Sequence, residues 1–236
     1  MKVSAITDVG KMRANNEDVF KVLEGINIFI VCDGMGGHQA GEIAAQIAAD
    51  DLAEALTNEY RVTEANFFDV MPEIFDKINK KIMALSSENE QYRNMGTTVV
   101  LACVINDVLL VANVGDSRCY VLSGDLKQVS KDHSLVAELL KIGSISEEEA
   151  ENHPDKNIIT SALGVDEKFD IFMDKVSLND VTHILLCSDG LSNMLSAHKI
   201  TEIINSTSNE LCVNRLIEVA NDHGGQDNIT VICIEI

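Results

Sequence analysis

A short glycine-rich stretch, Val31–His38, constrains this chain more than any other part of its sequence. It follows the apolar run Ile28–Val31, whose β-branched and aromatic residues are typical of a buried strand. It precedes an alanine-rich segment, residues 40–56, in which apolar side chains recur at helical spacing. We therefore expect a strand, a tight glycine turn and a helix, with Asp33 where the strand ends and His38 where the helix starts.

The composition favours a single globular domain that spans residues 1–236. A hydrophobic content of 46% is enough to build a sizeable core. No run of about 18 apolar residues occurs and Met1–Asp8 lacks the apolar centre of a signal peptide, so we expect a cytoplasmic protein without a membrane span. The six cysteines are dispersed without a CxxC pair, which favours buried free thiols over a zinc site.

The chain is strongly acidic, with 38 Asp and Glu against 18 Lys and Arg and a formal charge of −20. Binding to nucleic acid is disfavoured, because contacts with phosphates require a basic surface. Two explanations for the excess charge remain open. The carboxylates keep the protein soluble, or some of them hold cations.

The order of the expected elements indicates an α+β fold rather than a βαβ repeat. Helices precede a meander of strands, which is typical of an antiparallel sheet layered with helices. Residues 133–163 have weak periodicity, and we expect a flap there. The expected strands cover residues 2–8, 19–23, 27–32, 96–105, 108–113, 118–123, 169–176, 183–187 and 229–236, and the expected helices cover residues 40–56, 67–85, 197–205 and 210–221.

Acidic residues recur beside glycines where apolar strands end. The pattern occurs at Asp33-Gly34, Gly115-Asp116 and Asp189-Gly190, while Asp227 precedes the last strand and Glu17-Asp18 lies in a polar cluster. If these carboxylates meet at one edge of a sheet, each pair at about 4 Å repels by roughly 4 kcal/mol, and a cation is needed. All-oxygen ligands favour Mg²⁺ or Mn²⁺. The alternative is that the residues belong to separate loops that never meet.

Two further side chains are suited to phosphate chemistry. Arg13 offers a planar fork that matches a phosphate group, although a solvated surface arginine fits the sequence as well. His38 could donate a proton near neutral pH or have only a structural role. The P-loop pattern and the GxSxG nucleophile motif are both absent.

A series of short motifs spans almost the whole chain, and together they resemble the metal-dependent protein phosphatase family (PPM, type 2C). The resemblance is strongest to the small stand-alone bacterial Ser/Thr phosphatases. Any one motif is weak evidence, but their occurrence in the family's order is specific. The motifs are Thr7–Gly10 with Arg13 and Asn16–Asp18, Asp33–His38, Met95–Thr98, Asn113–Arg118, Asp132–Leu135, Thr160–Gly164, Cys187–Leu191 and Gly225–Thr230.

The resemblance implies an antiparallel β-sandwich flanked by helix pairs, with a centre for two Mn²⁺ or Mg²⁺ ions at one edge. Bacterial relatives often hold a third, weaker ion. The resemblance also implies a role for each matching residue. Asp33 would bridge the two metals, and the other ligands would be the Gly34 carbonyl, Asp189 and Asp227. The second metal's waters would be held by Glu17 and Asp18, and the third ion would be bound by Asp116. Arg13 would bind phosphate, and His38 would be the general acid.

The implied activity is hydrolysis of phosphoserine and phosphothreonine on proteins by a metal-activated water. The implied partners are phosphorylated proteins, including a bacterial Ser/Thr kinase whose action the enzyme would oppose, and we expect a monomer. A non-catalytic module that binds phosphoproteins is the first alternative, and it would be favoured by loss of Asp33, Asp189 or Asp227, none of which is lost. A metal-dependent phosphodiesterase is the second, and the −20 charge disfavours nucleic-acid substrates for it.

Overall fold

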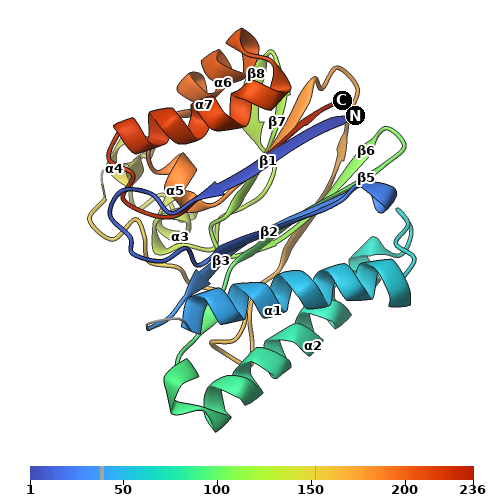
Figure 1. The fold of residues 1–236 in the computed structure, drawn as a ribbon, viewed down its shortest axis with the longest axis vertical. Coiled ribbons are helices and arrows are strands. Elements are labelled where there is room, and N and C mark those ends of the chain that lie inside the picture. Colours follow the sequence, from blue (N-terminus) through green and yellow to red (C-terminus); the bar gives the residue numbers. More distant parts are fainter. Residues whose placement is uncertain (38–39, 152) are drawn as a thin grey trace.

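Two antiparallel sheets pack face to face between layers of helices in the computed structural model, which describes residues 1–37, 40–151 and 153–236 (Figure 1). The first sheet has the order β1 (Lys2–Asp8), β11 (Ile229–Glu235), β10 (His183–Cys187), β7 (Arg118–Ser123) and β8 (Asp125–Gln128). The second has the order β2 (Asp18–Leu23), β3 (Ile28–Met35), β5 (Val99–Ile105), β6 (Val108–Val114) and β9 (Phe172–Ser177), with the short β4 (Gly96–Thr97) also paired to β3.

A pair of helices covers the outer face of each sheet. Helices α1 (Ala40–Glu54) and α2 (Phe67–Glu88) pack on the second sheet, and α6 (Ala197–Ser206) and α7 (Asn209–Asp222) pack on the first. Helix α5 (Asp189–Ser192) directly follows β10. The single-turn elements η1 (Glu24–Ile26), η2 (Ala55–Glu59) and η3 (Glu90–Tyr92) complete the connections. The expected α+β sandwich with flanking helix pairs is therefore confirmed.

The alternation of side chains along β3 explains how one strand serves two cores. Ile28, Ile30 and Cys32 face the α1–α2 layer, whereas Phe29 and Val31 pack between the sheets. Successive side chains of a strand point to opposite faces, so a fully apolar run is required wherever both faces are buried. The residue that follows Cys32 therefore belongs to the face between the sheets.

Strand β3 runs further than the sequence pattern predicted. We expected it to cover residues 27–32, but Gly34 pairs with Thr97 and Met35 with Gly96, so the strand continues to Met35. A Cβ atom on Gly34 would collide with the backbone oxygen of Gly41. The glycine thus lets the start of α1 and the Glu17 backbone approach the strand together.

The segment expected as a flap, described for residues 133–151 and 153–163, lies at the same end of the sandwich as the C-terminal end of β3, and we keep the name flap for it (Figure 1). It contains α3 (Leu135–Lys141) and α4 (Glu147–Glu151). Its base is closed by bridges that pair Ser134 with Ile159 and Thr97 with Leu163. Ser146 and Glu149 form a reciprocal cap at the start of α4, in which each backbone N–H donates to the other's side chain. Within the described residues, no helix has the length and apolarity needed to cross a membrane.

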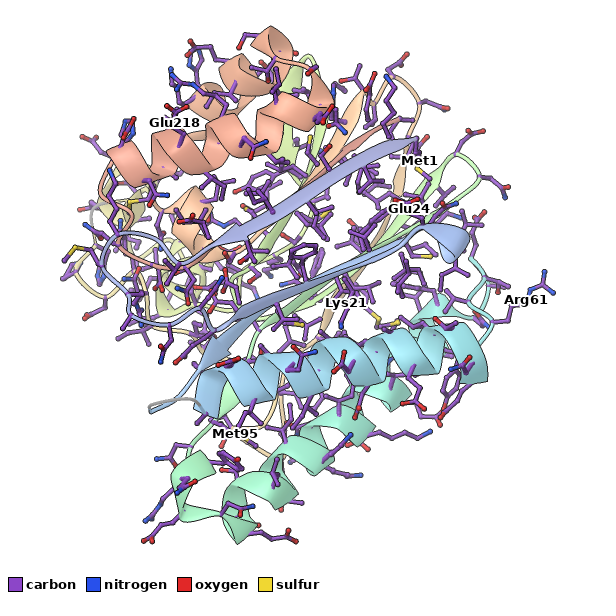
Figure 2. All side chains as sticks on the ribbon, in the orientation of Figure 1. Met1, Lys21, Glu24, Arg61, Met95 and Glu218 are labelled. Carbon is purple, nitrogen blue, oxygen red and sulfur yellow. The ribbon has the colours of Figure 1, made fainter. Side chains whose placement is uncertain are left out.

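One detail of the expected packing was wrong. The helical pattern of residues 210–221 groups Leu211 with Leu216, Ile217 and Ala220 on one side, but the Leu211 side chain is largely exposed on α7 while the other three are buried. Cys212 and Val213 are buried in its place. Figure 2 shows how densely side chains fill the two helix–sheet layers and the space between the sheets.

Candidate functional site

Carboxylates that lie far apart in sequence meet where the two sheets end beside the β1–β2 loop. Strand alternation points Asp33 into the space between the sheets, and its register partner on β2 is Asp18. The α5 N-terminus brings Asp189, and the turns after β6 and before β11 bring Asp116 and Asp227. We call this set, Asp18, Asp33, Asp116, Asp189 and Asp227, the acidic edge.

The mutual influence of these groups shows that they are close together. Desolvation raises the pKa of the Asp33 carboxyl well above its usual range, and the charges of Asp18 and Asp189 raise it further. Asp33 also shares a hydrogen bond with the Asp189 side chain. A carboxyl flanked by others retains its proton, because two like charges repel strongly in a poorly solvated site.

Three neighbours of Asp33 behave in the same way. Burial raises the pKa of Asp18 to about 7, although a hydrogen bond from Ser188 opposes the shift. Burial and then the charge of Asp189 raise the pKa of Asp116 to about 8. Burial and then the charge of Asp227 raise the pKa of Asp189 to about 6. The acidic edge thus gathers carboxyl groups whose ionisation the fold itself does not compensate.

Unpaired oxygens show that the acidic edge suits hard cations. Within the described part of the chain, Asp18 Oδ1, Asp116 Oδ1 and Asp189 Oδ1 are buried and have no hydrogen-bond partner. A buried carboxylate oxygen without a partner is costly, and a divalent cation would satisfy it. The described residues of the acidic edge offer oxygen ligands, which fits Mg²⁺ or Mn²⁺.

The described carboxylates do not form a complete metal cage by themselves. No three His, Cys, Asp or Glu side chains among the described residues are placed to hold one ion. Mg²⁺ sites often use only one or two carboxylates and keep several waters, so an open acidic edge remains compatible with such an ion. Backbone carbonyls such as that of Gly34 are further oxygen ligands of this type.

The Glu17 side chain lies beside the same edge. Its carboxylate is so close to Gly41 that a Cβ atom on this glycine would collide with Glu17 Oε2. Desolvation raises the pKa of Glu17, while the charge of Arg13 lowers it. The Glu17 carbonyl accepts a hydrogen bond of 3.1 Å from the Gly34 N–H, which joins the β1–β2 loop to β3.

Arg13 and Asp227 form an ion pair that the sequence did not predict. Arg13 Nη2 donates to Asp227 Oδ2 at 2.7 Å, and the Asn228 N–H donates to Asp227 Oδ1 at 2.8 Å. Both oxygens of Asp227 are therefore engaged. The arginine side chain is 52% exposed, so part of its guanidinium is accessible to a ligand. The expected general acid, His38, lies outside the described residues.

Hydroxyl and amide groups that the sequence reasoning passed over support the acidic edge. Thr98 Oγ1 accepts from the Asp33 N–H at 3.0 Å and pairs with Ser117 Oγ at 2.7 Å. Ser188 Oγ donates to Asp18 Oδ2 at 2.7 Å and accepts from the Thr230 N–H. These residues belong to the quoted motifs, but the motifs alone did not indicate which atoms they contact.

The flap is anchored to the turn that carries Asp116. The His133 N–H donates to the Gly115 carbonyl at 2.9 Å, and His133 Nδ1 accepts from the Gly115 N–H at 3.1 Å. Arg118 donates twice to Asp132 Oδ2 at the flap's base. Asn193 Nδ2 joins the flap to the acidic edge, since it donates to both Asn157 and Asp189.

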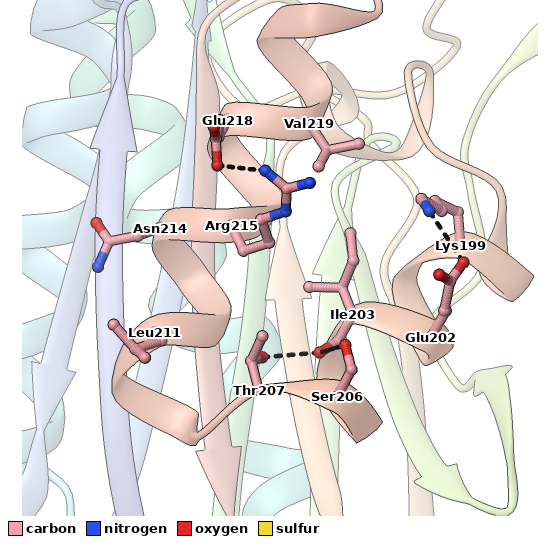
Figure 3. Close-up of a pocket in the computed structure, with 10 residues that line it drawn as sticks. All are labelled: Lys199, Glu202, Ile203, Ser206, Thr207, Leu211, Asn214, Arg215, Glu218 and Val219. Carbon is pink, nitrogen blue, oxygen red and sulfur yellow. Dashed lines mark hydrogen bonds and ion pairs between the residues drawn. The ribbon is translucent and has the colours of Figure 1, made fainter.

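The surface grooves found among the described residues lie elsewhere. One, of about 430 Å³, runs between α6 and α7, and the charged side chains along it are already paired as Lys199–Glu202 and Arg215–Glu218 (Figure 3). Another, of about 680 Å³, lies beside the end of α2 and includes Arg93 and Val165. Neither includes a residue of the acidic edge.

The arrangement matches known proteins over the whole chain. The family profile for protein phosphatase 2C matches residues 11–220. The serine/threonine phosphatase stp of Listeria monocytogenes is 41% identical, with 97% of this chain and 93% of the relative covered. The protein phosphatase PhpP of Streptococcus pneumoniae is 38% identical, with 100% and 98% covered.

Solved structures agree with the sequence matches. The crystal structure of the serine/threonine phosphatase Stp1 from Staphylococcus aureus has a TM-score of 0.94 at 33% identity, with 100% of this chain and 94% of that chain covered. The Mycobacterium tuberculosis serine/threonine phosphatase PstP/Ppp has a TM-score of 0.89 at 32% identity, with 100% and 98% covered. Fold, motifs and the convergence of the acidic edge lead to one conclusion: this chain belongs to the protein phosphatase 2C family.

Proposed function

We propose that this protein hydrolyses phosphoserine and phosphothreonine on other proteins, with Mn²⁺ or Mg²⁺ bound at the acidic edge. The observation that carries the proposal is the group of unpaired, buried carboxylate oxygens on Asp18, Asp116 and Asp189 around the proton-retaining Asp33. Family membership and relatives named serine/threonine phosphatases support the choice of substrate.

Two ions would be held by Asp33, Asp189, Asp227 and the Gly34 carbonyl. The waters of the second ion would be held by Glu17 and Asp18. A third ion would be held by Asp116 together with Asp189. When bound, such ions neutralise phosphate charge and lower the pKa of a water molecule towards about 7. The chain's own task is to keep these oxygens close together. Thr98 and Ser188 do so by holding the Asp33 backbone and the Asp18 side chain.

Arg13 is the phosphate-binding residue in this proposal. Its guanidinium projects from the β1–β2 loop over the acidic edge and is half exposed while it contacts Asp227. A guanidinium fork neutralises two oxygens of a phosphate at once, which stabilises the charge of a transferring phosphoryl group. We propose His38 as the group that protonates the leaving serine or threonine oxygen.

The proposed partners are phosphorylated proteins, including a Ser/Thr kinase, and the proposed location is the cytoplasm. A non-catalytic phosphoprotein-binding module would need a damaged site, but each proposed ligand is present in the sequence. A phosphodiesterase would require a diester to be preferred over a monoester, and no described feature favours that preference.

Release of phosphate from a phosphothreonine peptide tests the proposal directly. We expect turnover with Mn²⁺, little turnover in chelator, and slower cleavage of a phosphodiester model substrate. A protein that binds the phosphopeptide but releases no phosphate at any Mn²⁺ or Mg²⁺ concentration would instead be a binding module. Faster cleavage of the diester would favour the phosphodiesterase.

A further inference from the structure

The Asn228 side chain forms three hydrogen bonds with the backbone of the β1–β2 loop, two as a donor and one as an acceptor. It is 4% exposed and lies just before β11. Its Nδ2 donates to the Val9 carbonyl at 2.9 Å and to the Asn15 carbonyl at 2.9 Å. Its Oδ1 accepts from the Glu17 N–H at 2.8 Å. An amide group can satisfy three backbone groups in this way, and neither a carboxylate nor an aliphatic side chain can.

These contacts close the stem of the loop that presents Arg13. Val9 lies four positions before the arginine and Asn15 lies two positions after it, so one amide joins the two arms of the loop. Lys11 and Met12 also donate their backbone N–H groups to the Gly225 carbonyl at 2.8 and 3.1 Å. Residues 11–15 are exposed and belong to none of the hydrophobic clusters of the described residues.

Asn228 also contacts the acidic edge. The backbone N–H of Asn228 binds Asp227 Oδ1, which leaves Asp227 Oδ2 facing Arg13. The Glu17 backbone held by Asn228 in turn accepts from the Gly34 N–H at 3.1 Å. A single buried amide therefore fixes the arginine loop relative to both Asp227 and β3.

We propose that Asn228 is a positioning residue that holds Arg13 in place for phosphate binding. The role rests on the proposed function in that Arg13 is the phosphate ligand. Without the two Nδ2 hydrogen bonds, the loop arms separate and the arginine must lose conformational freedom each time it meets a phosphate. The consequence is weaker phosphate binding, not merely a less stable fold.

Asn209 is a matched control. It is also a buried asparagine, 8% exposed, and it lies at the start of α7, near the opposite end of β11. Its Nδ2 donates to the Lys2 carbonyl at 3.0 Å and to the Cys233 carbonyl at 3.4 Å, so it too joins β1 to β11 through an amide. It touches no residue of the acidic edge or of the arginine loop among its described hydrogen bonds.

The experiment compares Asn228→Ala and Asn228→Asp with Asn209→Ala and wild type, all saturated with Mn²⁺. Asn228→Asp keeps the shape and the acceptor for Glu17 but cannot donate to Val9 or Asn15. The primary readout is the dissociation constant of inorganic phosphate by calorimetry, and KM and kcat for a phosphothreonine peptide follow. Thermal midpoints report the structural cost of each change separately.

We expect both Asn228 variants to weaken phosphate binding and raise KM by about tenfold, with a smaller change in kcat, because the lost contact is made in the ground state as well as the transition state. Asn209→Ala should lower the thermal midpoint and leave the phosphate constant and KM at wild-type values. In an Arg13→Ala background, Asn228→Ala should add almost nothing to the phosphate defect, since contacting residues are non-additive.

The proposal is overturned if Asn228→Ala weakens phosphate binding equally with and without Arg13. It is also overturned if the Asn228 variants match Asn209→Ala in phosphate affinity. If both Asn228 variants fail to fold while Asn209→Ala folds, Asn228 is a folding residue and the positioning role is wrong. If wild type binds phosphate but releases none from the peptide, the proposed function fails, while loss of phosphate affinity in the Asn228 variants would still support the positioning role.

Discussion

The two ends of the β-sandwich use the same residue types for opposite purposes. At the end beside the flap, the acidic edge lies in a poorly solvated space. Burial and the charges of neighbouring carboxylates raise the pKa values of Asp18, Asp33 and Asp116 there. At the other end, which carries both chain termini in Figure 1, polar residues close exposed hairpins. We call this second end, with Asn27, Asn106, Asp107, Asp180 and the Lys2–Glu235 pair, the turn end.

At the turn end, Asn and Asp residues occupy backbone positions with positive φ. Asn27, Asn106 and Asp180 adopt φ values of 52°, 54° and 65°, a left-handed conformation that Asn and Asp tolerate better than most residues. Tight turns there connect strands at little cost. The carboxylates of the acidic edge relieve no such backbone conformation. Their burial instead lowers the free energy of unfolding when they are ionised.

The difference teaches that position within the sheet, not residue type, separates a structural aspartate from a candidate ligand. A carboxylate at an exposed hairpin is solvated and needs no partner. One on the face between the sheets must keep a proton, find a donor or bind a cation. The following changes either break this contrast or make it sharper.

The largest effect is expected for Asp33→Asn. We expect phosphate release from a phosphothreonine peptide at fixed Mn²⁺ to fall by about 1,000-fold, because the central carboxylate of the site is lost. Asp107→Asn at the turn end should keep wild-type activity. Comparable activities of the two variants would remove the contrast between the ends.

The acidic edge should also control how stability depends on pH. The folded-state pKa values of Asp189, Asp18 and Asp116 are raised to about 6, 7 and 8 from 3.8, so the folded protein holds protons that the unfolded chain releases. Their contribution is therefore complete below about pH 4 and is lost as pH rises through about 6 to 8.

Cation binding requires the ionised carboxylates, so Mn²⁺ should counter this loss. We expect the difference in thermal midpoint between Mn²⁺-loaded and chelated protein to widen from pH 5 to pH 8. The same difference in Asp33→Asn should stay small across that range. A gap in wild type that narrows with rising pH would contradict the assigned direction of the pKa shifts.

A smaller effect is expected for Thr98→Val, which removes the hydroxyl that accepts from the Asp33 N–H and pairs with Ser117. The buried partners are left unsatisfied, so the free energy of unfolding should fall by about 1–3 kcal/mol, as measured by urea denaturation. Thr182 near the turn end is an exposed residue whose hydroxyl donates a part-buried hydrogen bond to the Leu122 carbonyl, so Thr182→Val should cost less. Equal losses would mean that the Thr98 network has no special strength.

The sequence grouped the carboxylates of the acidic edge by one local feature, an acidic residue beside the end or the start of an apolar strand. Asp33 and Asp189 follow such strands, and Asp227 precedes the last one. This local feature could not show that β3 continues to Met35, because that depends on pairing with β4, which is distant in sequence.

The Arg13–Asp227 pair and the Asn228 contacts were also beyond prediction. They join residues more than two hundred positions apart, and no local pattern determines which amide meets which carbonyl. Leu211 is a different case, since the pattern grouped it with Leu216, but a separation of five residues does not place two side chains on the same face of a helix, and Leu211 is exposed.

The smallest effect is expected for Lys2→Ala at the turn end. Lys2 Nζ lies 3.2 Å from Glu235, but the two side chains are 77% and 38% exposed. Exposed ion pairs contribute about 0–1 kcal/mol, so urea denaturation should detect little change and peptide turnover should match wild type. A large loss of activity would show that the turn end takes part in catalysis.

Calorimetric titration of chelated protein with Mn²⁺ at pH 7 tests the central claim most directly, which is that the acidic edge binds divalent cations. We predict saturable binding with release of protons, revealed by repeating the titration in buffers of different ionisation enthalpy, because carboxyls such as Asp33 and Asp116 must ionise to bind the metal. Asp33→Asn should lose most of this binding, whereas Asp107→Asn should retain it. Absence of saturable Mn²⁺ binding to wild type, or equal binding by both variants, would contradict the claim.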